Sequence, residues 1–151
     1  MQVTLRQART QDFDFCAALY FAGMESVIRD LKLDRAAQVV SFRQQWELTQ
    51  VRIITTDGAD VGWLQSTTRE DSLFLAQLFV DASFQRRGIG TEVMHRLIAE
   101  AACARQAMTL GVVKINPALR LYERQGFLIT HEDDRKFYMR RDPDAESSIS
   151  R

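Results

Sequence analysis

The stretch that most constrains the fold is the run from Leu73 to Val80, which is apolar at nearly every position. A strand with one wet face alternates apolar and polar residues, whereas this run has apolar side chains on both faces and only Gln77 is polar. It is typical of a strand in the middle of a sheet covered on both sides. An amphipathic helix over 89–105 and another apolar strand, Met108–Val113, follow it. One helical crossover between these two strands predicts that they are parallel.

The rest of the sequence adds helices and antiparallel strands around this crossover. Helical periodicity predicts one helix after Thr10, which can serve as its N-cap, and another over 35–47. A short helix is expected between Asn116-Pro117, as its cap and first residue, and Gly126, as its C-terminal stop. Further strands are expected over 3–7, 51–55, 61–66, 127–129 and 136–139. The order β-α-α-β-β-β-α-β-α-β-β predicts an α/β (α+β) fold with a mixed central sheet of about six to seven strands.

Length and charge limit the classes of protein to which the chain can belong. Its 151 residues suit one domain, expected over residues 1–141, while residues 142–151 are polar and are expected to form a flexible tail. Lys plus Arg equals Asp plus Glu, 20 each, so no net charge favours a nucleic acid or a membrane as a partner. The sequence shows neither a signal peptide nor a run long enough to span a bilayer, which predicts a cytoplasmic protein.

The cysteines and histidines do not form the pattern of a metal site. Cys16 and Cys103 lack Cys-x-x-Cys spacing, and His95 and His131 have no ligands gathered near them in the sequence. We therefore expect two buried, unpaired cysteines and no metal.

The segment that follows the central strand has the features of an anion site. Gly88 and Gly90 allow an anion to approach the backbone at the start of a helix, while Arg86 and Arg87 add positive charge and Thr91 adds a hydroxyl. A Gly-x-Gly pair alone is also ordinary at a helix start. The segment is not a Walker loop, which needs Gly-Lys-Ser/Thr, nor a dinucleotide fingerprint, which needs a third glycine.

Two motifs together resemble those of the GCN5-related N-acetyltransferase (GNAT) superfamily. Its Gln/Arg-x-x-Gly-x-Gly/Ala motif is matched by Gln-Arg-Arg-Gly-Ile-Gly at 85–90. Its Asn…Ala-x-x-x-Tyr-Glu-x-x-Gly-Phe motif is matched at 116–127, although the family often has one more residue between the Asn and the Tyr. The resemblance extends to about Arg140 and implies the GNAT fold and an acyl-CoA substrate. It says little about the acceptor.

The resemblance implies a transferase that moves an acetyl group from acetyl-CoA to a primary amine of a small molecule or peptide. Acetyl-CoA would lie in a V-shaped opening between the two parallel strands. Its pantetheine arm would pair with the backbone of Leu78, Phe79 and Val80, and a backbone N–H near Val80 would polarise the thioester carbonyl. The other implied contacts to acetyl-CoA are Gln85, Arg86, Arg87, Gly88, Ile89, Gly90, Thr91, Asn116 and Tyr122. We expect a monomer or a homodimer.

Tyr122 is the catalytic residue that the resemblance implies, as the acid that protonates the departing CoA thiolate. A tyrosine on an amphipathic helix can equally be a core residue, and both interpretations remain open from the sequence alone. The acceptor pocket is expected to form from 21–33, the hairpin strand 61–66 and the last strands.

The general base is left open by the sequence. The strand at 110–114 has no carboxylate, although many relatives carry a Glu there. Glu25, Glu70, Asp71 and a chain of water molecules are the alternatives. The missing carboxylate also keeps open a second function, a non-catalytic acyl-CoA-binding sensor or interaction module on the same fold.

Overall fold

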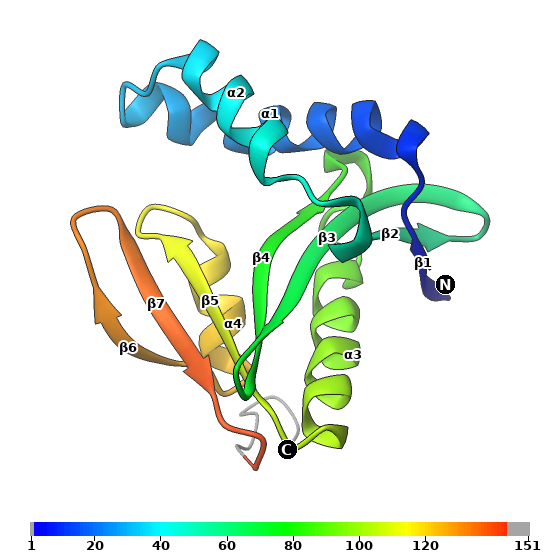
Figure 1. Cartoon of the computed structure of the whole chain (residues 1–151), viewed down its shortest axis with the longest axis vertical. Helices are drawn as coiled ribbons and strands as arrows, with labels where there is room; N and C mark the ends of the chain where they lie inside the picture. The colour runs from blue at the N-terminus through cyan, green and yellow to red at the C-terminus, as the bar shows by residue number, and fades with distance from the viewer. Residues whose placement is uncertain (1, 145–151) are drawn as a thin grey trace. The chain divides into compact units, whose positions relative to one another are not determined.

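A computed structural model describes residues 2–144 of the chain. Its seven strands form one mixed sheet in the order β1-β2-β3-β4-β5-β7-β6 (Figure 1). The strands are β1 (Val3–Gln7), β2 (Val51–Thr56), β3 (Ala59–Arg69), β4 (Ser72–Val80), β5 (Ala107–Val113), β6 (Leu128–Glu132) and β7 (Lys136–Arg141). The helices are α1 (Phe13–Asp30), α2 (Arg35–Gln45), α3 (Ile89–Cys103) and α4 (Ala118–Arg124), with short 3-10 helices at Thr10–Asp12, Leu48–Gln50 and Ala82–Phe84. The predicted fold class and order of elements are confirmed.

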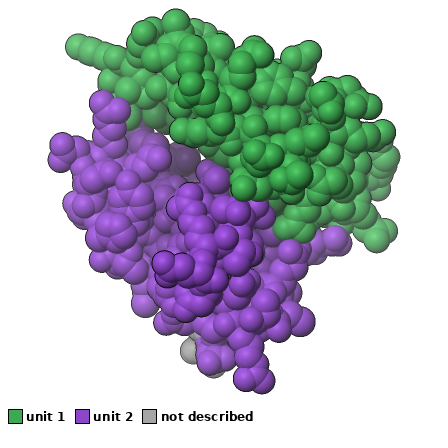
Figure 2. All heavy atoms as spheres, viewed as in Figure 1, with its two compact units in different colours: residues 1–65, 77–90 green, residues 66–76, 91–151 purple. Residues whose placement is uncertain are grey.

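The chain divides into two compact units built from interleaved segments (Figure 2). Unit 1 comprises residues 1–65 and 77–90, and unit 2 comprises residues 66–76 and 91–151. The single domain over 1–141 therefore remains a prediction. The predicted tail at 142–151 lies outside the described residues from 145 onward.

Aromatic packing forms the core of unit 1. Strands β1, β2 and β3 form an antiparallel ladder in which Ile53 is paired with Trp63. The ring of Phe42 in α2 lies 4.7 Å from that of Tyr20 in α1 and 5.9 Å from that of Trp63 in β3. The apolar faces predicted for both helices are thus packed on one another and on the sheet.

The start of α1 differs from the prediction. Thr10 lies in a 3-10 turn instead of capping the helix. The buried Asp12 carboxylate accepts the backbone N–H of Arg9 at 2.7 Å and an ion pair from Arg6 at 2.9 Å. The bond from Arg6 holds the pKa of Asp12 below its ordinary value. The Asp12 carboxylate, fixed by Arg6 of β1, therefore takes the place of the predicted Thr10 cap. The local sequence does not indicate the contact between Arg6 and Asp12.

In unit 2, β4 and β5 pair in parallel from Ser72↔Ala107 to Leu75↔Leu110, as the crossover predicts. Strand β5 also pairs with β7, and β7 with β6, both antiparallel. Strand β4 lies in the middle of the sheet, as predicted, and none of its residues is exposed: Ser72 and Leu75 are buried and the other seven are half-buried. An apolar run indicates that its side chains favour apolar surroundings. The side chains of residues 78–80 are only half-buried by the rest of the protein.

The stripe predicted on α3 is confirmed by burial. Ile89, Val93, Leu97 and Ala101 are each at most 2% exposed. Cys103 in the last turn is exposed whereas Cys16 is buried, so the prediction that both cysteines are buried is wrong for Cys103.

Within residues 2–144, no helix is long and apolar enough to cross a membrane. The same residues contain no group of three or more His, Cys, Asp or Glu side chains placed to hold a metal ion.

Candidate functional site

The loop between β4 and α3 is fixed by side chains at its beginning. The Asp81 carboxylate accepts the backbone N–H of Ser83 at 2.9 Å and its hydroxyl at 2.8 Å, and these bonds hold the pKa of Asp81 below its ordinary value. The Gln85 side-chain amide donates to the carbonyl of Val80 at 2.9 Å. These bonds shape the loop without using the backbone N–H groups that follow Gln85.

Those N–H groups gather at the start of α3. Within the described chain, no hydrogen bond occupies the backbone N–H groups of Arg86, Arg87 and Gly88, and the first turn of a helix leaves its own N–H groups without intrahelical acceptors. The Arg87 guanidinium lies 5.1 Å from the centre of the Phe84 ring. Free N–H groups, two arginines and the positive end of a helix together favour an anion such as a pyrophosphate.

The two glycines of this loop serve different purposes. Gly88 has φ +79°, a left-handed conformation that glycine adopts most easily. Gly90 is helical, and a Cβ at either position would meet no heavy atom within 4 Å. A helical glycine costs about 0.5–1 kcal/mol relative to alanine, so neither conformation nor packing explains Gly90. Close approach of a bulky ligand to the free N–H groups does explain it.

Within unit 1, Phe79 anchors the end of β4. Its ring stacks on Trp63 at 5.6 Å and meets Tyr20 edge-on at 5.4 Å. A Cβ on Gly23 would lie 2.8 Å from this ring, and a Cβ on Gly62 would lie 2.4 Å from the Phe79 carbonyl oxygen. Neither glycine belongs to a recognised motif, although a glycine inside a strand, such as Gly62, is a known sign of close backbone approach.

The second motif folds as predicted at both ends of α4, with a shift of one residue. The Asn116 side-chain oxygen accepts the backbone N–H of Ala118 at 2.9 Å, so Asn116 does cap the helix, but Pro117 precedes the first helical residue instead of being it. Gly126 has φ +96°, and the N–H of Phe127 returns to the carbonyl of Tyr122 at 3.1 Å, which closes the C-terminus.

Tyr122 is 9% exposed and packs edge-on against Phe127, with ring centres 6.0 Å apart. Burial raises the pKa of its hydroxyl to about 12, so the phenol keeps its proton at neutral pH. The neighbouring Gln125 is fully buried, and its side-chain amide reaches the carbonyl of Thr91 in α3 at 3.4 Å. Arg141 of β7 donates to the Gln125 carbonyl at 2.7 Å. Unit 2 therefore holds a neutral phenol on a well-anchored helix.

The chain matches the family model of the acetyltransferase (GNAT) domain over residues 47–129, more than half of its length. The chain belongs to the GNAT acetyltransferase family. Among curated protein sequences, none matches this chain.

Solved structures agree with the GNAT assignment at the level of the fold. The PaiA N-acetyltransferase of Thermoplasma acidophilum, solved in complex with coenzyme A, is 17% identical with a TM-score of 0.68, over 94% of this chain and 99% of that one. Ard1 of Thermoplasma volcanium is 18% identical with a TM-score of 0.68, over 94% and 98%. An N-acetyltransferase of Staphylococcus aureus Mu50 is 17% identical with a TM-score of 0.67, over 95% and 100%.

The residues expected to form the GNAT site divide between the two units. Unit 1 contains those from Leu78 to Gly90, which the end of β4 and the start of α3 bring together. Unit 2 contains Thr91, Asn116 and Tyr122, of which Thr91 is joined to α4 through Gln125.

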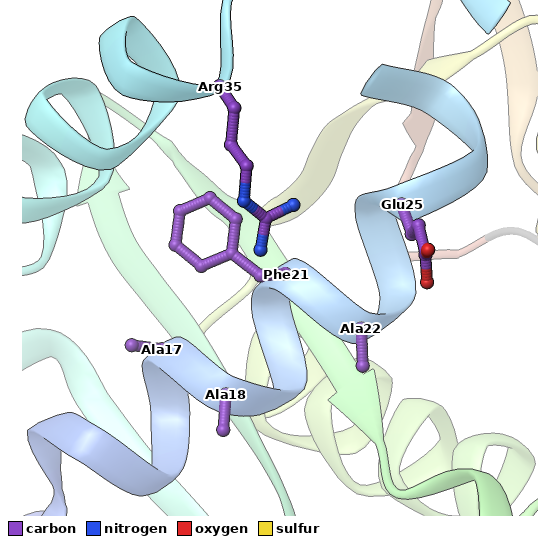
Figure 3. A pocket seen from close by; sticks show the side chains of 6 residues that line it. All are labelled: Ala17, Ala18, Phe21, Ala22, Glu25 and Arg35. Carbon is purple, nitrogen blue, oxygen red and sulfur yellow. The ribbon is translucent and has the colours of Figure 1, made fainter. Parts of the chain in front are cut away.

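Glu25, one of the possible bases, lies on the outer side of α1. It lines an open hollow of about 550 Å³ with Ala17, Ala18, Phe21, Ala22 and Arg35 (Figure 3). Gly23 faces Phe79, and two residues along a helix amount to a turn of about 200°. The Glu25 carboxylate therefore points away from the end of β4, where the thioester is expected.

Glu70 and Asp71 lie in the turn before β4, at the opposite end of that strand from Val80. A strand rises about 3.3 Å per residue, which separates Asp71 from Val80 by roughly 30 Å. All three carboxylates proposed from the sequence thus lie away from the expected position of the thioester. Which group acts as the general base therefore stays a prediction from the sequence.

Proposed function

We propose that this protein is an N-acetyltransferase that transfers the acetyl group of acetyl-CoA to a primary amine by direct attack in a ternary complex. The loop at 86–90 is the observation that carries the proposal. Its backbone N–H groups are unused by the protein, and Gly90 has no structural reason to be a glycine. Membership in the GNAT family supports acetyl-CoA as the ligand that this loop binds.

In this proposal the loop and the end of β4 bind different parts of acetyl-CoA. The N–H groups of 86–91, with Arg86 and Arg87, hold the pyrophosphate, and the backbone of 78–80 pairs with the pantetheine arm. The Asn116 side-chain oxygen is occupied by its helix cap. Its amide nitrogen is therefore the group with which it contacts acetyl-CoA.

The reaction forms a C–N bond and breaks the C–S bond of the thioester. The amine attacks in its neutral form, because an ammonium group has no lone pair. The leaving thiolate takes a proton from the Tyr122 hydroxyl, which burial keeps protonated. The proton lost by the amine passes to solvent through a chain of water molecules, since Glu25, Glu70 and Asp71 lie elsewhere. Protons then balance over the cycle once Tyr122 is reprotonated from water.

A second candidate is a non-catalytic acyl-CoA-binding module. The strand residues 110–114 carry no carboxylate, which favours this alternative. It shares the loop at 86–90 with the enzyme and differs from it only in lacking turnover.

Binding and turnover of the wild-type protein separate these candidates. Calorimetry should show that acetyl-CoA binds, and a thiol-release assay with a panel of primary amines and peptides should show amine-dependent release of CoA. Binding without release from any amine would support the acyl-CoA-binding module. Absence of binding would overturn both.

A further inference from the structure

Strand β3 meets the end of β4 at Gly62. An ideal Cβ on Gly62 would lie 2.4 Å from the carbonyl oxygen of Phe79 and 3.2 Å from the Cα of Val80. A contact as short as 2.4 Å is essentially never observed for a Cβ, and 3.2 Å is tighter than most. Both atoms belong to the backbone, which cannot swing aside as a flexible side chain can. The Phe79–Val80 peptide thus occupies the space that a side chain at position 62 would need.

The direction of this peptide follows from its contact with Gly62. In a trans peptide the C=O and N–H bonds point to opposite sides. The Phe79 carbonyl lies against Gly62, so the N–H of Val80 points away from it. Immediately beyond, the N–H of Asp81 donates to the carbonyl of Val61 at 2.8 Å, which ties the end of β4 to β3.

The side chain of Phe79 is confined as closely as its carbonyl group. Its ring lies between Trp63 and Tyr20, and a Cβ on Gly23 would come within 2.8 Å of it. Gly62 does not have the positive φ that would itself require glycine. Close approach of the Phe79–Val80 peptide is therefore the reason why position 62 has no side chain.

We infer that Gly62 is a positioning residue for acetyl transfer: its missing side chain keeps the Phe79–Val80 peptide in the orientation from which the N–H of Val80 donates to the thioester carbonyl. The inference rests on the proposed function. Negative charge builds on that carbonyl oxygen as the amine attacks, and a donor fixed in advance stabilises it. Loss of one such donor in other enzymes lowers kcat by about 10²–10³-fold.

The variant Gly62→Ala tests the inference. We expect kcat at saturating substrates to fall by at least about tenfold, because the added methyl displaces the peptide that carries the donor. The dissociation constant of CoA should change by less than about threefold, because the loop at 86–90 binds the phosphates separately. The control is Val51→Ala, which removes buried side-chain atoms from the neighbouring strand β2, outside the expected acceptor pocket and without pushing on Phe79. A merely structural role for Gly62 predicts that both variants behave alike, with kcat retained.

A measurement on the wild-type protein covers the case in which Gly62→Ala does not fold. The amide proton of Val80, followed by NMR, should move downfield when acetyl-CoA replaces CoA, because only the thioester brings a carbonyl to it. An identical Val80 signal with both ligands would overturn the inference, as would an unchanged kcat in Gly62→Ala. Wild-type protein that releases no CoA with any amine would instead overturn the proposed function, and the inference with it.

Discussion

The loop at 86–90 and helix α4 carry the two GNAT motifs, and they differ in how far the protein's own packing explains their residues. In the loop, Gly90 has open space around it and an ordinary helical conformation. In and after α4, Tyr122, Gln125 and Phe127 are all buried, and Gly126 has the positive φ that ends the helix. The proposed ligand would explain Gly90 in the loop, whereas the residues of α4 are already explained by packing.

This difference decides which experiments are informative. A loop variant can remove binding while the fold survives, because the fold does not depend on the residue. A variant in α4 must keep the packing in order to reveal any chemistry. Each prediction below tests one side of the comparison.

The largest effect is expected for Tyr122→Phe, which keeps the ring against Phe127 and removes only the hydroxyl. Turnover should fall by about one to three powers of ten, the usual contribution of a general acid, while acetyl-CoA affinity and stability change little. Steady-state kinetics and calorimetry measure both. Thr49→Val, which removes an exposed hydroxyl bonded to Glu47 in the 3-10 turn before β2, is the control and should keep full turnover. Full turnover of Tyr122→Phe, with the chemical step limiting, would leave Tyr122 as a core residue only.

The pH dependence of stability tests the burial of the same hydroxyl. Its pKa is raised from 10.0 to about 12 in the folded protein. The contribution of Tyr122 to the free energy of unfolding is therefore complete below pH 10 and is lost as the pH rises towards 12. The loss reaches about 1.4 kcal/mol at pH 11. Denaturant unfolding between pH 9 and pH 11 should show a steeper decline for wild type than for Tyr122→Phe. Parallel curves would mean that the hydroxyl is hydrated in the folded state.

Gly88→Ala tests the loop against a matched glycine elsewhere. Gly88 and Gly58 both have positive φ, +79° and +83°, and both face open space. Alanine at either position should cost about 1–2 kcal/mol of stability through backbone strain. Only Gly88→Ala should also weaken acetyl-CoA binding, by about tenfold or more, which corresponds to about 1.4 kcal/mol. Equal affinities of the two variants would argue that no ligand occupies the loop.

Gly90→Ala should produce opposite changes in stability and binding. Alanine is the better helix former, so thermal unfolding should show an equal or higher Tm. The methyl group would project in front of the free N–H groups, and we expect acetyl-CoA affinity to fall by about three- to tenfold. A gain in stability without a loss of affinity would show that ligands do not approach the backbone at position 90.

The order of elements could be predicted from the sequence because it depends on local periodicity. The stripe on α3, the parallel pairing of β4 with β5 and the stop at Gly126 all follow from spacing or from a single residue type. The start of α1 could not be predicted, because the Asp12 carboxylate that accepts the Arg9 N–H is held by Arg6 of strand β1. The central place of β4 could be predicted from its apolar run, but hydrophobicity alone does not show how completely each of its side chains is covered.

The candidate site divides in the same way. The residues of the loop at 85–91 were identifiable because their motif is contiguous, and the backbone N–H groups of Arg86, Arg87 and Gly88 make no hydrogen bond within the described residues. Gly23 and Gly62 could not be identified from the sequence, because what excludes a side chain at each position is Phe79, which is distant in the sequence. The possible bases Glu25, Glu70 and Asp71 were chosen by residue type, and only three-dimensional placement shows which way each one faces.

The smallest effect is expected from Gln125, the buried link between α4 and Thr91. Its side-chain oxygen has no hydrogen-bond partner, and its amide reaches Thr91 only at 3.4 Å. Gln125→Met keeps the length of the side chain and removes an unsatisfied acceptor, so the free energy of unfolding should change by less than about 1 kcal/mol.

Gln65 is the matched control for this substitution, because it is also buried but its amide donates to the Gln45 carbonyl at 2.8 Å and to the Gln50 side chain at 3.0 Å. Gln65→Met leaves those acceptors unpaired and should cost about 1–3 kcal/mol. Denaturant unfolding of both variants compares a satisfied buried amide with an unsatisfied one. A loss in Gln125→Met as large as in Gln65→Met would mean that water satisfies the Gln125 oxygen. The end of α4 would then be held by a polar network that includes water, and not by packing alone.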